Sequence, residues 1–209
     1  MFWSVSLFLL LGLAIWLWAS ARYMVRASDG VVIDRRPGHA LLLVDFQAAC
    51  WDDAYYEAPM RSRVETAVVR EVALAQRDDI PVIALRHEWS GIGTRLVAHL
   101  QHQAGLIKGK PGTELATPFA NLADHTVLKR VEDGFETGEL DALLQVLDVG
   151  HLLIMGRDGA HAVARTTQAA LNRGYDVTLV ADGIATAQPG GFQDVADALM
   201  SQGAEIRHG

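Results

Sequence analysis

Short runs of apolar residues alternate with amphipathic stretches along residues 37–209. A strand buried on both faces reads as a nearly continuous apolar run, whereas a strand with one wet face alternates polar and apolar positions. Continuous runs separated by helices indicate a parallel sheet with helices on both faces. The sequence therefore predicts an α/β fold with a doubly wound, mainly parallel sheet of six strands.

The expected elements follow from these two patterns. Continuous apolar runs predict strands over residues 39–45, 81–86, 126–129, 151–156, 176–181 and 204–207. Apolar side chains at helical spacing predict helices over residues 60–78, 139–147, 162–173 and 194–202. Ligands of such sheets bind beyond the carboxyl ends of the strands, at the point where the strand order reverses. We therefore look for functional side chains directly after the strands.

The first 21 residues form a separate apolar segment, and the first charged side chain is Arg22. A helix of about 20 apolar residues spans the hydrocarbon core of a bilayer. Trp3, Trp16 and Trp18 lie near the ends of the segment, where indole rings favour the membrane interface. We expect a single transmembrane anchor over residues 1–21, followed by a linker over residues 22–37.

The arginines after this segment predict its orientation, because basic residues flank membrane spans on the cytoplasmic side. The domain that follows is therefore expected to be cytoplasmic. The alternative is an exported protein, since residues 19–21 resemble an A-x-A site and a signal peptide would be cleaved near Ala21. The absence of a basic region before the apolar run favours the anchor.

Charge and cysteine content exclude several classes of protein. The chain has 18 Lys and Arg against 25 Asp and Glu, so a strongly basic nucleic-acid-binding protein is excluded. The single cysteine, Cys50, excludes an intrachain disulfide framework and a cysteine-based zinc cluster. His87 and Glu88 follow the second strand but form only a weak metal signal. We expect neither a metal nor another cofactor.

Charged side chains stand at the ends of several predicted strands. Asp45 follows four apolar residues in LLLVDFQ, and Lys129 ends the third strand in HTVLKR. The carboxyl ends of parallel strands meet at one edge, so the two side chains can share a site suited to general acid–base chemistry. The alternative is a buried ion pair, or an aspartate that caps the next turn.

These segments resemble the isochorismatase-like hydrolases, also called the cysteine hydrolase superfamily, over residues 38–209. LLLVDFQ is similar to the family's first-strand segment, which implies a catalytic Asp45 with Gln47 two residues later in the substrate site. LKRVEDGF resembles the segment K-x-x-x-S-A-F, which implies that Lys129 is the catalytic lysine and Phe135 the site phenylalanine. The resemblance thus implies an isochorismatase-like hydrolase domain acting on a small molecule.

One departure from the family pattern changes the expected chemistry. Residues 156–163 resemble the segment G-x-x-T-x-x-C-V, but the nucleophilic cysteine falls on Ala162 and the threonine on Gly159. Alanine cannot attack a carbonyl, so the thioester chemistry of the amidase branch is not available in the usual way. Cys50 is expected to be a packed thiol rather than a substitute nucleophile.

The isochorismatase branch of the family carries glycine in place of the cysteine and hydrolyses a vinyl ether. The resemblance therefore implies that Asp45 protonates the vinyl carbon, that water attacks, and that Lys129 positions the acid. Arg95 lies in a segment, SGIGTRLV, that resembles the branch's Thr-Arg region, and is expected to pair with a substrate carboxylate. A solvated helix residue is the alternative for Arg95. His87 is expected to line the pocket, with a satisfied loop histidine as the alternative.

Three hypotheses follow from these residues. The first is a membrane-anchored isochorismatase-like hydrolase that acts on a small cyclic or carboxylate-bearing substrate by Asp/Lys acid–base catalysis, without a cysteine nucleophile. The second is an inactive pseudoenzyme that serves as a ligand-binding or scaffold module. The third is a membrane-assembly protein whose domain supports oligomerisation, because the resemblance implies a homo-oligomer.

Overall fold

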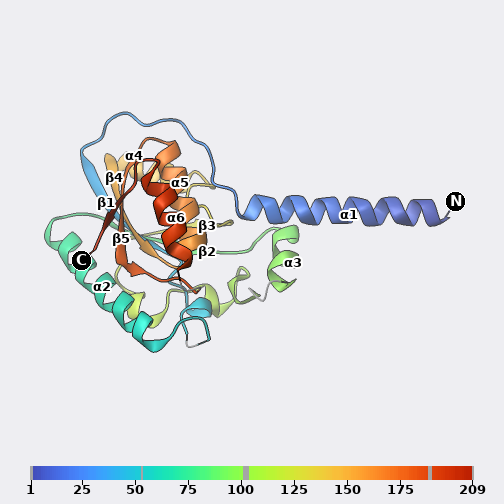
Figure 1. Cartoon of the computed structure of the whole chain (residues 1–209), viewed down its shortest axis with the longest axis horizontal. Helices are drawn as coiled ribbons and strands as arrows, with labels where there is room; N and C mark the ends of the chain where they lie inside the picture. Colours follow the sequence, from blue (N-terminus) through green and yellow to red (C-terminus); the bar gives the residue numbers. More distant parts are fainter. Residues whose placement is uncertain (1, 53, 101–103, 188–189, 209) are drawn as a thin grey trace.

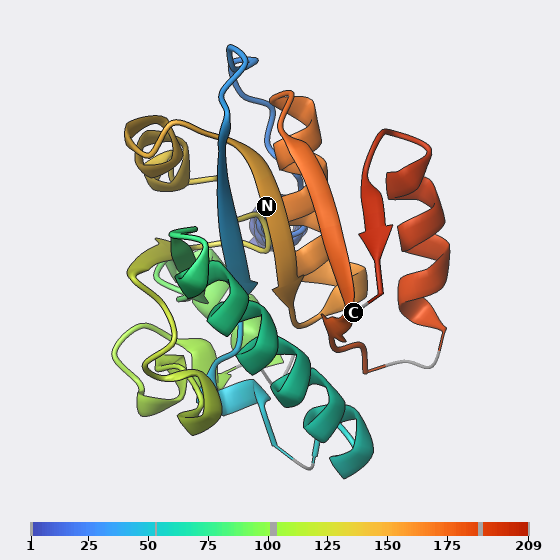
Figure 2. The same ribbon diagram turned by 90° about the vertical axis from the view of Figure 1, so that its left-hand side faces the viewer.

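The computed structural model describes the backbone of residues 2–52, 54–100, 104–187 and 190–208, and the side chains of these residues except 2–7, 9 and 104. One sheet of six strands forms the centre of the molecule, in the order β3-β2-β1-β4-β5-β6 (Figure 2). All paired strands are parallel. The strands are β1 (Gly38–Val44), β2 (Val82–His87), β3 (His125–Lys129), β4 (Val149–Gly156), β5 (Asp176–Ile184) and β6 (Glu205–Arg207). The predicted α/β fold is therefore confirmed.

Helices cover both faces of this sheet (Figures 1 and 2). The helices of the described chain are α1 (Phe2–Met24), α2 (Ala58–Arg77), α3 (Ile92–Leu100), α4 (Glu139–Val146), α5 (Ala164–Asn172) and α6 (Gly191–Met200). Buried side chains of α2 pack on one face of the sheet, and those of α4, α5 and α6 pack on the other. This two-sided cover makes the sheet doubly wound.

The central strand β1 shows why the strands are apolar throughout. Leu41 and Leu43 pack toward α2, whereas Leu42 and Val44 pack toward the opposite helices. Successive side chains of a strand point to opposite faces, so both sets are buried. Loss of water contact on each face stabilises the fold by about 25 cal/mol per Å² of apolar surface.

The helix α1 extends away from the body of the protein, and its last turns lie beside α3 (Figure 1). Leu17, Ala21 and Met24 pack against a cluster that includes Trp89. The approach is close at Gly93 of α3, where an added Cβ would lie 2.6 Å from Oγ of Ser20. The first turns of α1 are thus free of the body, while its last turns are part of it.

No helix within the described part of the chain is long and apolar enough to cross a membrane. Much of the predicted span, including Trp3, lies outside the residues whose side chains are described. The predicted transmembrane helix therefore finds no support in the described residues.

The segment expected to be a linker lies against the domain. The backbone N–H of Ile33 donates to the carbonyl of Arg173 at 2.8 Å. The backbone N–H of Ser28 donates to the carboxylate of Asp133 at 2.7 Å, and Nη1 of Arg173 donates to the carbonyl of Ser28 at 3.1 Å. These contacts fix the path of the chain between α1 and β1.

Two elements differ from the prediction. The helix α3 was not predicted, although a solvated helical position was one of the two alternatives for Arg95. The helix expected over residues 162–173 begins instead with a π-helical turn, Gly159–Val163, which precedes α5. The carboxylate of Asp158 caps this turn by accepting from the backbone N–H of Ala160 at 3.2 Å, which satisfies a donor that the turn leaves unpaired.

Candidate active site

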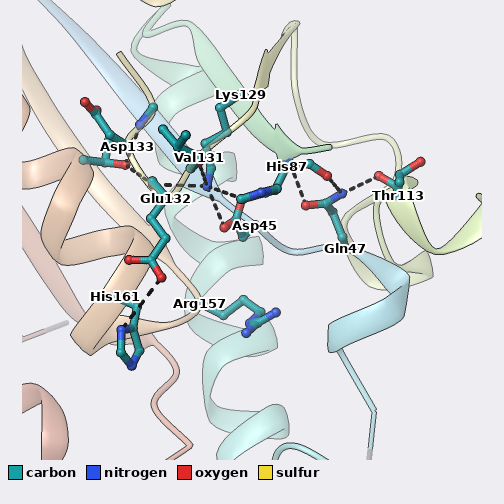
Figure 3. Close-up of polar contacts among 12 residues, drawn as sticks. Asp45, Gln47, His87, Thr113, Lys129, Val131, Glu132, Asp133, Arg157 and His161 are labelled. Atoms are coloured by element: carbon teal, nitrogen blue, oxygen red, sulfur yellow. Dashed lines mark hydrogen bonds and ion pairs between the residues drawn. The ribbon is translucent and has the colours of Figure 1, made fainter. Parts of the chain in front are cut away.

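Three neighbouring strands end at one edge of the sheet and bring three predicted residues together. Asp45 follows β1, His87 ends β2 and Lys129 ends β3. The strand order reverses beside β1, between β1 and β4, which is the position where doubly wound sheets bind ligands. Figure 3 shows the side chains of these residues pointing toward one another.

The backbone of Asp45 is held in an uncommon conformation. Its φ is 58°, in the left-handed region that residues other than glycine rarely adopt. The N–H of Asp45 donates to the carbonyl of Leu85 at 3.0 Å, and its own carbonyl accepts from the N–H of Gln47 at 2.7 Å. Strained residues of this kind cluster at functional sites because the surrounding structure holds them there.

The ammonium of Lys129 is completely enclosed, with 0% of the residue exposed. Its Nζ donates to Oδ2 of Asp45 at 2.8 Å and to the carbonyls of Val131 and Glu132 at 3.1 Å each. It also lies 3.2 Å from Nδ1 of His87. These partners satisfy the donors of a buried cation, so Lys129 fixes the Asp45 carboxylate in one place.

The second oxygen of Asp45 is not bound to Lys129. Oδ1 is buried and has no hydrogen-bond partner within the described structure. Burial raises the pKa of Asp45, while the nearby charges of Lys129 and Arg157 act in the opposite direction. A carboxyl group with a raised pKa keeps its proton to higher pH and can donate it to a bound molecule.

His87 presents a hydrogen-bond donor to the same space. Nδ1 of His87 faces the ammonium of Lys129, which has no acceptor, so Nδ1 presents its lone pair there and the proton of the neutral ring lies on Nε2. Nε2 is buried and has no partner among the described residues. Burial first, and then the charges of Lys129 and Arg157, hold the pKa of His87 well below its usual value. The ring is therefore neutral at physiological pH.

A cavity of about 310 Å³ lies over the cluster, near the lower end of the roughly 300–1,000 Å³ typical of small-molecule sites. Its wall is formed by Ala21, Met24, Val25, Asp45, Cys50, Tyr55, His87, Trp89, Leu106, Glu132, Arg157, Asp158, His161 and Ala162. Part of this wall thus comes from the end of α1. The backbone N–H of Glu132 donates to the carbonyl of Met24 at 2.9 Å, which ties α1 to the loop after Lys129.

Ionisable side chains line the rest of the cavity. Glu132 lies 3.9 Å from Nδ1 of His161, and Figure 3 shows the two side chains pointing toward each other. Burial raises the pKa of Glu132, while His161 and Lys129 act against this rise. Arg157 forms part of the wall next to Cys50, and burial raises the pKa of the Cys50 thiol although Arg157 opposes the rise.

The structure places the remaining predicted residues as follows. Ala162 lines the cavity, as expected for the position of the missing nucleophile. Gln47 is buried but uses its amide on the backbone of His87 and Thr113, and it is not part of the cavity wall. Phe135 lies in the hydrophobic core under the guanidinium of Arg173. Arg95 is exposed on α3 and also lies outside the cavity wall.

Gly159 is fixed by packing rather than by contact with the cavity. A Cβ added at this position would lie 2.6 Å from Oγ1 of Thr186 and 2.8 Å from Cγ2 of Ile184. The N–H of Gly159 donates to the carbonyl of Ala185 at 2.9 Å. The family threonine that the resemblance places here would not fit this arrangement.

Sequence reasoning missed several residues of the cavity. Arg157 and Glu132 follow strand ends, so the rule that selected Asp45 also offered them. The contribution of Met24 carried no local signal, because it depends on contact with Glu132, far along the chain. No group of three or more His, Cys, Asp or Glu side chains within the described ranges is arranged to hold a metal ion.

The chain is similar to known hydrolases in sequence. Residues 39–208 match the model of the isochorismatase domain family. A streptothricin hydrolase of Streptomyces noursei is 34% identical over 119 residues, which cover 53% of this chain and 43% of that protein. The match thus spans less than half the length of the streptothricin hydrolase.

Solved structures share the fold. A pyrazinamidase of Pyrococcus horikoshii in complex with zinc has a TM-score of 0.69 and 19% identity, covering 83% of this chain and 100% of that chain. An N-carbamoylsarcosine amidase of Thermoplasma acidophilum has a TM-score of 0.67 and 18% identity, covering 82% of this chain and 96% of that chain. At this level of identity the similarity concerns the fold alone.

Proposed function

The chain belongs to the isochorismatase family, and we propose that it is a hydrolase that works without a cysteine nucleophile. In this proposal Asp45 is the acid and Lys129 positions it. The observation that carries the proposal is Oδ1 of Asp45, a buried oxygen without a partner among the described residues, in a cavity that Ala162 also lines. A fixed carboxyl group with a raised pKa suits proton transfer, whereas an alanine methyl cannot form a thioester.

The reaction class that fits is hydrolysis of an enol ether. Asp45 donates its proton to the terminal vinyl carbon, and water adds to the oxocarbenium carbon that results. The proton lost by this water returns to Asp45, and the hemiketal separates into an alcohol and a ketone. Lys129 holds the carboxyl group throughout, and Nε2–H of His87 is available to a substrate oxygen.

The size and charge of the cavity define the substrate class. A volume of about 310 Å³ suits a single small ring or a short chain. The guanidinium of Arg157 at the wall favours a substrate that carries a carboxylate. We therefore propose a small cyclic or carboxylate-bearing substrate.

An assay of the full chain with isochorismate and with nicotinamide tests the proposal. The first is a cyclic vinyl ether that carries carboxylates, and the second is a small amide. We expect turnover of the vinyl ether, and a loss of about 10²–10⁴-fold in Asp45→Asn because the acid is removed. Asp176→Asn, at an exposed aspartate, should keep full activity. Undiminished turnover by Asp45→Asn would overturn the mechanism.

A pseudoenzyme is the second candidate, and Ala162 is the observation that favours it. The cavity then binds a ligand and carries out no reaction. This reading predicts binding without turnover for both probes. Amidase activity in Ala162→Cys would indicate an amidase cavity that lacks only its nucleophile.

We propose that α1 attaches the protein to a membrane, with the domain on the cytoplasmic side. Its exposed apolar side chains between Phe8 and Trp18, on a helix that leaves the body of the protein, support this proposal. Resistance of the full chain to extraction by alkaline carbonate is the expected result. Release of a mature protein that begins at Arg22, directly after Ala21, would instead indicate a cleaved signal peptide.

The family resemblance also leads us to propose a homo-oligomer. Light scattering of the full chain in detergent, after correction for the micelle, measures the protein mass directly. A mass of one chain across the concentration range would contradict this part of the proposal.

A further inference from the structure

The strongest unassigned feature of the cavity is Arg157, the residue after β4. Its backbone N–H donates to the carbonyl of Val44 at 3.0 Å, which continues the pairing of β1 with β4 and directs the residue to the switch point. The side chain is half-buried and forms part of the cavity wall. A cation in this position needs a partner of opposite charge, because a poorly hydrated charge is costly when it is unpaired.

The surrounding side chains fix the guanidinium but do not neutralise it. Nε of Arg157 donates to the hydroxyl of Tyr56 at 3.1 Å. The guanidinium carbon lies 5.9 Å from the ring centre of Tyr55 and 6.0 Å from that of Tyr56, within the range of cation–π attraction. The Cys50 thiol also interacts with this guanidinium. A guanidinium has five N–H donors, so donors are left for a charged acceptor within the cavity.

Each acidic side chain of the cavity has a contact with a group other than Arg157, although Oδ1 of Asp45 and Oε2 of Glu132 have no hydrogen-bond partner among the described residues. Oδ2 of Asp45 accepts from Lys129, and the carboxylate of Asp158 accepts from the N–H of Ala160. Glu132 lies beside His161. None of the described carboxylates forms an ion pair with Arg157, whereas the buried cations Lys129 and Arg173 each have one.

We propose that Arg157 is the anion-binding residue of the cavity and that it pairs with the carboxylate of a small substrate through its two terminal nitrogens. This inference rests on the proposed function and identifies the substrate-binding cation that Arg95 was expected to supply. The planar guanidinium matches a carboxylate in two parallel hydrogen bonds, which sets orientation as well as affinity. The rest of a ring-sized substrate then lies within the same cavity as Oδ1 of Asp45.

Matched acid and amide probes test the proposal without any need for turnover. Nicotinate and nicotinamide, and benzoate and benzamide, have the same shape and differ in charge. Isothermal titration of the full chain in detergent should show binding of each acid at least about tenfold tighter than its amide, the effect expected for a charge-assisted hydrogen-bond pair. Equal affinity for acid and amide, or no binding of either acid, would overturn the proposal.

Substitutions then assign the preference to one residue. Arg157→Gln should remove the preference for the acids, and Arg157→Lys should keep part of it, because an ammonium retains the charge but not the planar fork. Arg95→Gln, at the exposed arginine of α3, is the matched control and should bind like the unaltered protein. A preference that survives Arg157→Gln would overturn the assignment. If Arg157→Gln does not fold, the proposal can still be tested by comparing acid with amide binding in the unaltered protein and in the Arg157→Lys variant.

The binding test and the activity test fail independently. Anion binding that depends on Arg157, together with no turnover of isochorismate, would support the inference and contradict the proposed hydrolase. Turnover that requires Asp45, together with equal binding of acids and amides, would support the hydrolase and overturn the role of Arg157. Repeating the titration with Asp45→Asn separates the anion site from the acid.

Discussion

The Nζ atom of Lys129 lies 2.8 Å from Oδ2 of Asp45, although Lys129 ends β3 and Asp45 follows β1, and these two strands are not neighbours. Strand β2 lies between β1 and β3, so the lysine side chain crosses the end of β2 and meets His87 on the way. One ammonium thereby sets the relative positions of three strand ends. The hydrogen bond from Lys129 that holds the acid of the proposed reaction therefore also holds the ends of the central strands together.

This arrangement predicts a pH-dependent loss of stability in Lys129→Met. The substitution leaves an ionised Asp45 buried without its cation, which typically costs about 3–5 kcal/mol of unfolding free energy. Because burial raises the pKa of Asp45, protonation relieves the unpaired charge at acid pH, and the loss should be smaller at pH 5 than at pH 8. Urea denaturation at both pH values measures it. Lys110→Met, at an exposed lysine, is the control, and an equal loss at both pH values would contradict the prediction.

The activity should fall as the pH rises, because only the protonated carboxyl of Asp45 can donate. Its raised pKa moves this fall upward from the ordinary aspartate value of about 3.9. The direction of the change depends on the role of Asp45, because an enzyme that used Asp45 as a general base would become more active over the same pH interval. A profile of kcat/KM against pH for isochorismate measures the effect. A rate that increases through this interval would show that Asp45 acts as a base.

Cys50→Ala should leave most of the activity in place. Under the proposed mechanism kcat changes by less than about tenfold, whereas loss of a covalent nucleophile costs factors on the order of 10⁶. The substitution is more informative than alkylation, since Cys50 lines the cavity and an attached group would block it under any mechanism. A collapse of kcat in a folded Cys50→Ala protein would make the thiol the nucleophile.

Gly159→Ala should destabilise the protein by about 1–3 kcal/mol, as overpacking of a filled site generally does. The new methyl group would meet Oγ1 of Thr186 at 2.6 Å. Thermal unfolding monitored by circular dichroism measures the change. Gly12→Ala adds the same methyl group where, apart from the neighbouring residues and backbone of its own helix, no described heavy atom lies within 4 Å, and the melting temperature of this variant should not fall. A stable Gly159→Ala would show that the turn can widen.

Gly93→Val should separate α1 from α3. A Cβ at Gly93 would lie 2.6 Å from Oγ of Ser20 and 2.9 Å from the ring of Trp16. Trypsin should then cut after Arg22 and Arg26 at least about tenfold faster, because cleavage follows local opening. The rate of appearance of the shortened chain measures this. Gly12→Ala should be cut at the original rate.

The sheet and the central pair of the site could be predicted from local patterns. Apolar runs locate strands because burial on both faces leaves no place for polar side chains, and Leu41 to Val44 meet this condition. Asp45 and Lys129 interrupt or end such runs, so packing alone does not account for them. The rule that parallel strands end at one edge then brings the two residues together, and the structure agrees.

The direction of side chains in the turns could not be predicted in the same way. Arg95 lies in α3 after β2 and is exposed, whereas Arg157 directly follows β4 and lines the cavity. The difference depends on how the chain turns after each strand, and the backbone of Arg157 is set by its pairing with Val44. Neither the composition nor the residue spacing predicts the path of the chain through these segments.

The carbonyl of Met24 accepts from the backbone of Glu132, and Ala21, Met24 and Val25 complete the cavity wall. A shortened chain that starts after this segment would lack this part of the wall, so its cavity would be more open to water than that of the full chain. Ligand screens on the two molecules would rank compounds differently. A bound ligand would touch water in the shortened chain where it touches methionine and alanine side chains in the full chain. The end of the helix that we propose to attach to a membrane thus also forms part of the wall of the proposed substrate site.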